Sequence, residues 1–387
     1  MTRIPWKLVR WPNSIFFIGT LLLTLTVVPV YIWRQGLDAF QIALFLFFWA
    51  ATQLSITLGY HRLFSHRAFQ AAWPVRLFTL LFGAAAFEHS VLVWAAEHSK
   101  HNKFVDHEED PYDISKGFFH AHIGWILFKL QEDTSLDGVN DLRQDRLVAW
   151  QHRHYHLLAT LTCFVLPTVL GWLWNGASGA LASFLISGIA RVVCVNHATF
   201  FINSLCHTLG RRPYSSKNTA RDSAIMAVLT MGEGYHNFHH AFQHDYRNGV
   251  KPWQFDPTKW RIWTLNKLGL TRQLRRVPVE RILLAETTEQ QRQLAEKLTA
   301  LPVPLAEPIH SRLQAAQARL HQTFQHWERL EAEYSQVAHK KLEASREKLA
   351  KLRRDFQDAR DRFQAALRDW QEAHRLALAE FALGATA

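Results

Sequence analysis

The sequence predicts an all-α membrane protein with four transmembrane helices in two hairpins, a cytoplasmic helical domain that caps them, and a long C-terminal helical extension. Three observations lead to this fold class. Apolar runs of bilayer length occur in two pairs, Lys and Arg concentrate outside these pairs, and the end of the chain is a polar stretch with seven-residue apolar spacing.

The apolar runs of the first pair cover about 15–33 and 39–60, and those of the second pair cover about 157–174 and 177–200. An α-helix rises about 1.5 Å per residue, so runs of this length can cross the hydrocarbon core of a bilayer. We expect Arg191, inside the last run, to extend its charge to the membrane interface. The first run is longer than the core of a typical signal peptide, so we expect it to remain as an anchor.

The distribution of basic residues predicts the orientation of the chain. Three of them precede the first run, whereas the two short loops inside the hairpins carry only one. By the positive-inside rule, both termini and the active site are expected to be cytoplasmic. The apolar segment Leu77–Trp94 contains Glu88 and His89 and is expected to be an interfacial or pocket-lining helix, because a fifth span would separate the histidine clusters described below.

Charge and composition narrow the classes of partner. A net charge of +11 fits either nucleic acid or an anionic membrane surface. The chain has no nucleic-acid-binding motif and no Lys/Arg-rich run interleaved with aromatic residues, so we expect the lipid bilayer and no nucleic acid. The chain has only three cysteines and no CxxC pair, so nothing in the sequence indicates a disulfide framework or a cysteine-bound metal.

Composition also predicts three parts. Residues 1–284 form the membrane-embedded domain, 285–308 form a linker that ends in a proline-rich hinge at 301–308, and 309–387 form a coiled-coil-like extension. Apolar residues recur every seven positions in that extension, in two phases: Leu313, Leu320, Trp327 and Tyr334, then Leu349, Phe356, Phe363 and Trp370. Such helices either pack on their own chain or self-associate, and the spacing leaves both possibilities open.

Four histidine patterns lie beside or soon after the apolar segments. They are His61-Arg-Leu-Phe-Ser-His66, His98-Ser-Lys-His101-Asn102, Asn203-Ser-Leu-Cys-His207 and Gly232-Glu-Gly-Tyr-His236-Asn-Phe-His239-His240. Residues three or four apart share one face of a helix, so such pairs can present imidazoles to one metal ion. Eight histidines are too many for one ion, and neutral imidazole suits iron, copper, zinc and nickel, so the patterns predict a site for two metals.

Together these residues resemble the membrane fatty acid desaturase family, and within it the acyl-CoA delta-9 (stearoyl-CoA type) branch. The resemblance covers roughly residues 40–260 and includes three further motifs. They are Asp110-Pro-Tyr112, Gly117-Phe-Phe119 and His122-Ile-Gly-Trp125.

The resemblance implies two iron ions, with a ligand set carried over position by position. The implied ligands are His61, His66, His98, His101, His207, His236, His239 and His240, and Asn203 is implied to contact one metal through water.

The chain departs from the family pattern at its second cluster. Asn102 stands where the family usually has a third histidine, and an Asn oxygen is a neutral and weaker ligand; His89, His107 or His197 are the candidate replacements. Ala96 and Ser99 stand where family members often carry Arg near the phosphates of the acyl carrier. A phospholipid-linked acyl chain therefore remains open beside acyl-CoA.

The implied activity is the O2-dependent insertion of a cis double bond, at delta-9, into a long saturated fatty acyl chain. Iron fits the redox demand, whereas redox-inert zinc does not. No haem-binding His-Pro-Gly-Gly or CxxC iron site is present, so a separate ferredoxin-, rubredoxin- or cytochrome b5-like electron donor with its reductase is expected.

Three other functions remain as alternatives. A related histidine-rich di-iron enzyme would hydroxylate or oxidise its substrate, which product analysis distinguishes as an alcohol instead of an alkene. A metal transporter would place ionisable residues inside its spans, where this chain has few. A catalytically weakened scaffold that acts through its C-terminal extension would lack bound iron.

Overall fold

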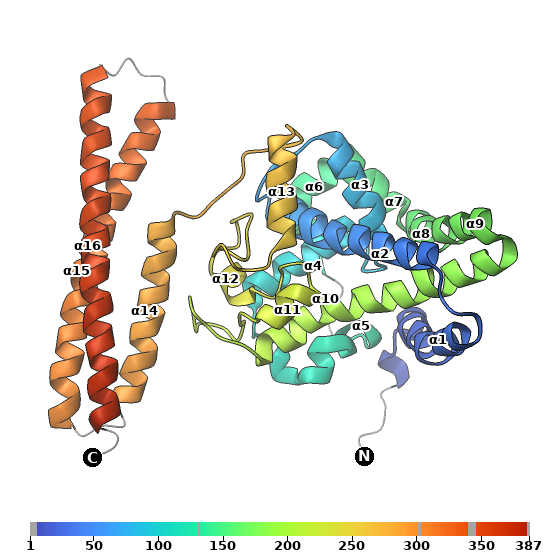
Figure 1. The fold of residues 1–387 in the computed structure, drawn as a ribbon, viewed down its shortest axis with the longest axis horizontal. Helices are drawn as coiled ribbons and strands as arrows, with labels where there is room; N and C mark the ends of the chain where they lie inside the picture. The colour runs from blue at the N-terminus through green and yellow to red at the C-terminus, as the bar shows by residue number, and fades with distance from the viewer. Residues whose placement is uncertain (1–5, 131, 133, 300–302, 340–345, 385–387) are drawn as a thin grey trace. The chain divides into compact units, whose positions relative to one another are not determined.

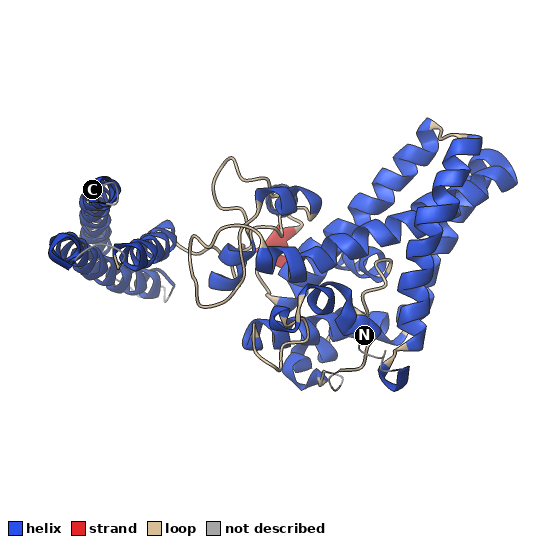
Figure 2. Ribbon diagram, turned by 90° about the horizontal axis from the view of Figure 1, so that it is seen from below, coloured by secondary structure: helices blue, strands red, loops and turns tan. Residues whose placement is uncertain are grey.

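The computed structural model describes residues 6–130, 132, 134–299, 303–339 and 346–384. Contacts divide the chain into two compact units. The first comprises Met1–Arg212 and Lys217–Arg276, and the second comprises Pro213–Ser216 and Val277–Ala387. The predominance of helix confirms the predicted class, since the only sheet in the described part is a two-stranded antiparallel ladder of β1 (Gln70–Ala71) and β2 (Thr271–Arg272) (Figure 2).

Three helices of the first unit are long and apolar enough to cross a membrane: Trp11–Gln35, Ala39–Ser65 and Tyr155–Thr208. The first is α1, and Gly36 ends it at a φ of 72°, in the left-handed region that favours glycine. The second starts with α2 (Ala39–Leu54), where the Asp38 carboxylate accepts the Gln41 N–H and the Gln41 side chain accepts the Asp38 N–H. This capping box fixes the turn between the two helices of the first hairpin.

The third candidate span corresponds to both runs of the second predicted pair. It consists of successive segments: α8 (Tyr155–Thr160), η6 (Leu161–Val165), α9 (Leu166–Ser183), η7 (Phe184–Ala190) and α10 (Arg191–Thr208). The chain reverses inside α9, because Asn175 and Gly176 have non-helical backbone angles. A Cβ atom on Gly171 would clash with the Gly179 carbonyl oxygen, so glycine lets the two arms of this hairpin meet (Figure 1).

Arg191 does not reach the membrane interface, so that prediction is wrong. The side chain is fully buried and donates hydrogen bonds to the carbonyls of Ser187, Ala85 and Cys163 at 3.1, 2.8 and 3.3 Å. These backbone carbonyls satisfy the buried guanidinium inside the protein. The Arg191 side chain therefore does not extend to the membrane–water interface.

The apolar segment 77–94 is also not one helix. It contributes to α3 (Trp73–Ala84) and α4 (Val91–Phe104), which are separated by a loop at 85–90. Phe87 and His89 in this loop have positive φ values of 58° and 70°, a region that non-glycine residues rarely adopt. The break turns the side chain between them, Glu88, into the interior, where it is 5% exposed.

η2 (Ser55–Ser65) continues α2 and completes the second candidate span, and the remaining helices of the first unit are short. They are η1 (Trp6–Leu8), η3 (Ile114–Lys116), η4 (His120–Gly124), α5 (Trp125–Leu127), η5 (Leu136–Val139), α6 (Asn140–Gln144), α7 (Arg146–Arg153), α11 (Ala224–Leu229), α12 (His236–Ala241) and α13 (Pro257–Lys267).

The second unit is a bundle of α14 (Val279–Leu298), α15 (Val303–His339) and α16 (Arg346–Gly384). Several of the predicted heptad residues, among them Leu320, Trp327 and Phe363, form its buried core. The predicted apolar stripe therefore packs within the chain, and self-association stays a prediction. Residues 279–298, most of which the sequence analysis assigned to the linker, form α14, and α15 begins at Val303 with Pro308 inside it. Within the expected hinge, 301–302 lie outside the described residues.

Candidate metal centre

The first pair of histidines depends on an unusual helix. His61 and His66 are five residues apart, which places them on different faces of an α-helix. The chain instead forms a π-helix, η2, and the His66 N–H donates to the His61 carbonyl at 3.1 Å, five residues back. Because the hydrogen bonds of a π-helix join residues five apart, His61 and His66 lie nearly one above the other, and their ring centroids are 4.8 Å apart.

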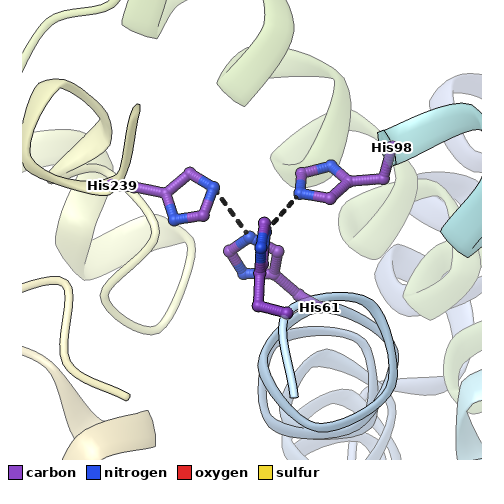
Figure 3. A group of neighbouring side chains, drawn as sticks. His61, His98 and His239 are labelled. Carbon is purple, nitrogen blue, oxygen red and sulfur yellow. Dashed lines mark hydrogen bonds between the residues drawn. The ribbon is translucent and has the colours of Figure 1, made fainter. Parts of the chain in front are cut away.

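Four imidazoles meet beside this π-helix. His61, His66, His98 and His239 each have a ring nitrogen within 4.8 Å of the others, and all four side chains are buried. Figure 3 shows the rings of His61, His98 and His239, which come from three separate elements and point toward one another. The Nε2 atoms of His61 and His239 are 3.2 Å apart, and those of His66 and His98 are 2.8 Å apart. These four residues are called the first histidine group.

A second histidine group consists of His101, His207, His236 and His240, again with ligand atoms within 4.8 Å of one another. The Nε2 atom of His236 lies 3.1 Å from that of His207 and 3.0 Å from that of His240. α4 and α12 each serve both groups, because α4 supplies His98 to the first and His101 to the second. α12 supplies His239 to the first group and His236 and His240, four apart on one face, to the second.

Three of these rings have a carboxylate or a hydroxyl beside Nδ1, the ring nitrogen that faces away from the group. His61 Nδ1 lies 2.8 Å from Glu233 Oε2, and His101 Nδ1 lies 2.8 Å from Asp110 Oδ1. His207 Nδ1 lies 2.8 Å from the Thr219 hydroxyl, which itself donates to Asp106. A proton on Nδ1 leaves the lone pair on Nε2, which is the tautomer of a histidine that ligates metal.

The donor set fits a cation at each group. Two Nε2 lone pairs that face each other at about 3 Å repel unless a positive ion lies between them. Burial and then the neighbouring imidazoles lower the pKa of His66, His98, His236, His239 and His240 well below the usual value. These rings are neutral near pH 7 and available as ligands. Acid protonates the ligand nitrogens, so metal affinity decreases as the pH falls.

A buried ion-pair network supports the first group from behind. Arg62 is 1% exposed and donates to Glu233 Oε1 at 2.9 Å and to Asp256 Oδ2 at 3.1 Å. Burial opposes ionisation of Glu233, but the Arg62 guanidinium and His61 outweigh it and lower the pKa of Glu233 to about 2. Glu233 is therefore a permanent anion that accepts from both Arg62 and His61.

Asp110 offers a test of the second group, because its carboxylate orients His101. Replacing Asp110 by Asn should lower metal affinity at this group by about 10–100-fold, since the anionic acceptor of the Nδ1 proton is lost. Iron retained against a chelator measures the effect. Asp113→Asn is the matched control, because Asp113 is equally buried but accepts from Ser115. Equal iron retention in both variants would contradict the assigned role of Asp110.

The structure brings together all eight histidines predicted as ligands. Asn203 lines a cavity of about 40 Å³ together with His61, His98, His101 and His236. The Asn102 amide is buried, and neither its nitrogen nor its oxygen has a hydrogen-bond partner in the described structure.

None of the three candidate replacements for Asn102, His89, His107 and His197, belongs to either group. His197 instead pairs with His122 at 2.9 Å. The sequence analysis also missed the roles of Glu233, Asp110 and Asp106, although the first two lie inside motifs that it quoted; their acidic character beside histidines was the available signal.

Comparison with known proteins identifies the kind of protein that carries these groups. The family model of fatty acid desaturases matches residues 37–270. The chain belongs to the fatty acid desaturase family. This membership and the helices of membrane-spanning length make it an integral membrane protein with a histidine-rich metal centre.

Individual relatives of this chain are named for acyl-CoA substrates. Acyl-CoA desaturase 1 of Saccharomyces cerevisiae is 38% identical over 299 residues, which are 76% of this chain and 58% of that protein. Probable acyl-CoA desaturase of Schizosaccharomyces pombe is 37% identical over 279 residues, 71% of this chain and 57% of that protein. Stearoyl-CoA desaturase of Homo sapiens is 32% identical over 284 residues, 70% of this chain and 76% of that protein. The chain thus spans somewhat over half the length of the two fungal relatives.

Proposed function

We propose that this chain is an O2-dependent desaturase that inserts a cis double bond, at delta-9, into a long saturated fatty acyl chain during unsaturated fatty acid biosynthesis. The observation that carries the proposal is that two four-histidine groups, with seven of their eight side chains buried, both contribute to the wall of one cavity in a chain of this family. The relatives named for acyl-CoA and stearoyl-CoA support the substrate class.

We propose one iron ion at each histidine group, with Asn203 as a ligand through water to one of them. Iron supplies the one-electron and O2 chemistry that breaking an unactivated C–H bond requires. The histidines would hold the ions, and Glu233 and Asp110 would keep the ligand rings in the correct tautomer. As a metal ligand, Asn102 offers at most a neutral amide oxygen. Its side-chain amide is buried and has no hydrogen-bond partner in the described structure, which is consistent with a minor role in metal binding.

The cavity wall suits an apolar chain near the metals. Besides the histidines, Ile56, Trp94 and Ile202 contribute apolar surface to it. These side chains would bind methylene groups and exclude water from the reacting carbons. Acyl-CoA and a phospholipid are the two candidate carriers of the acyl chain. The phospholipid stays a candidate because Ala96 and Ser99 provide no positive charge for the phosphates of CoA.

We further propose that four spans cross the bilayer, with both termini and the histidine groups on the cytoplasmic side. The basic residues outside the apolar runs support this orientation. A separate ferredoxin-, rubredoxin- or cytochrome b5-like donor would deliver two electrons per turnover. Basic residues such as Arg211, Arg212 and Lys217 would attract an acidic electron donor. The alternative is that their charge reflects only the excess of basic residues on the cytoplasmic side of a membrane protein.

The direct test is gas chromatography–mass spectrometry of total fatty acids from cells that express the chain together with an electron-donor system. We expect a new monounsaturated chain, and chemical derivatisation of its double bond reports the position. His240→Ala should remove the product, because it deletes a member of the second histidine group. His156→Ala is the control, since this histidine is exposed and belongs to neither group.

Each outcome of this experiment has a clear meaning. Hydroxylated fatty acids in place of alkenes would assign the chain to the related hydroxylases. Neither product, from protein with bound iron and a supplied donor, would contradict the proposed function and favour a scaffold role.

A further inference from the structure

The loop between α3 and α4 buries a carboxyl group that the metal centre does not use. Glu88 is 5% exposed and lies between Phe87 and His89, which both have positive φ. Such backbone persists only where the surroundings hold it in place. The Tyr155 hydroxyl provides part of this support, because it accepts the His89 N–H at 3.1 Å.

The hydrogen bonds around Glu88 favour a neutral acid. The Trp94 indole N–H donates to Oε2 at 3.3 Å, whereas Oε1 is buried and receives no hydrogen bond. The Thr199 hydroxyl lies beside this carboxyl, but it donates its only proton to the Val195 carbonyl at 3.2 Å. Toward Glu88 the Thr199 oxygen can therefore only accept. An ionised Glu88 would place a lone pair of its carboxylate against a lone pair of the Thr199 oxygen. A protonated Glu88 can instead donate its proton to that oxygen.

The two partners of Glu88 belong to the wall of the cavity at the histidines. Trp94 and Thr199 both line it, from α4 and α10. The Trp94 ring also stacks on His98 of the first histidine group, with centroids 4.9 Å apart and planes inclined by 22°. A hydrogen-bond bridge through Glu88 between Trp94 and Thr199 would thus set the relative position of two sides of this cavity.

We propose that Glu88 acts as a neutral carboxylic acid that bridges Trp94 and Thr199 and so shapes the cavity for the acyl chain, and that its ionisation breaks this bridge in alkaline solution. Glu88 is a positioning residue, since it acts through Trp94 and Thr199. The role in catalysis rests on the proposed desaturase function.

The electrostatic surroundings agree with this role. Burial raises the pKa of Glu88 to about 8, and this effect outweighs the hydrogen bond from the Trp94 indole N–H, which favours the anion. The other titratable groups that interact with Glu88 are the phenols of Tyr60, Tyr112 and Tyr155. The buried guanidinium of α10, Arg191, binds the Ala85 carbonyl and Cys163.

The sign of the pH dependence follows from this raised pKa. The folded protein holds the proton on Glu88 up to about pH 8, so the bridge is complete below that pH and is lost as the pH rises through it. If the bridge is required, kcat/KM for desaturation declines as the pH rises through about 8 and then levels off at a value roughly tenfold lower.

The experiment compares the full-length wild type with Glu88→Gln and Glu88→Leu between about pH 6 and pH 10. An amide accepts from Trp94 and donates to Thr199 without ionising, so Glu88→Gln should lose the alkaline decline in kcat/KM. Leucine can form neither bond, so at every pH Glu88→Leu should have a kcat/KM roughly tenfold below that of the wild type at neutral pH. A wild-type alkaline decline that persists unchanged in Glu88→Gln would overturn the proposal.

A second measurement does not depend on activity. Infrared difference spectra of the purified protein should show the carbonyl band of a protonated carboxylic acid that disappears as the pH rises through about 8, and Glu88→Gln should lack this band. Its absence from the wild type would refute the neutral acid. The band without any desaturation in any sample would instead contradict the proposed function and leave the protonation of Glu88 established.

Discussion

Replacing His98 by alanine is expected to halve the bound iron and to abolish desaturation. His98 belongs to the first histidine group only, so the second group, with His101, His207, His236 and His240, keeps all its ligands. His236→Ala should halve the iron in the same way from the other side, and the double variant should bind almost none. Desaturation should fall by more than the roughly 100-fold that loss of an outer-shell partner produces, because a direct ligand is missing.

Metal analysis of purified protein, with fatty acid analysis of the same preparations, measures both effects. His156→Ala is the control, because it removes an exposed imidazole that belongs to neither group. A wild type that binds one ion, or single variants that both lose all iron, would show that the two groups do not act as separate sites. Full iron content in His98→Ala would exclude His98 as a ligand.

Replacing Glu233 by glutamine is expected to destabilise the first unit and to weaken its metal binding. Glu233 accepts hydrogen bonds from Arg62 and from Asn248, and it holds His61 at 2.8 Å. The amide leaves the buried Arg62 guanidinium with one carboxylate, that of Asp256, so the expected cost is smaller than the about 3–5 kcal/mol that follows when a buried charge loses its only partner. The free energy of unfolding in detergent, measured without metal, reports this cost separately from iron binding.

The dependence of the free energy of unfolding on acidic pH provides a second test of Glu233. Because the pKa of Glu233 in the folded protein is about 2, its stabilising contribution is present at neutral pH and is lost as the pH falls from the ordinary carboxyl range toward that value. Glu233→Gln should lack this part of the acid dependence. Glu296→Gln is the control, because its pair with Arg292 is exposed and worth about 0–1 kcal/mol. If the two variants unfolded alike, Glu233 would not be the anchor of the network.

Much of the candidate site could be predicted from local spacing. His236 and His240 are four apart and do share one face of α12, as the periodicity of a helix requires. His61 and His66 were singled out by their place in a motif, but an α-helix cannot bring residues five apart together. The π-helix η2 explains why the two rings lie close together, and no pattern in the sequence predicted a π-helix at this position.

By itself, the sequence determined the helical class, the apolar runs and the set of histidines, because each depends on residue type and on spacing within one segment. The tertiary structure alone decided how the histidines divide between two groups, with His98 on one side and His101 on the other. It also decided that Arg62 meets Asp256, which lies 194 positions away, and that Arg191 is buried among carbonyls. Partners of a buried charge come from whichever segments pack beside it, and the packing of distant segments is not encoded in any one of them.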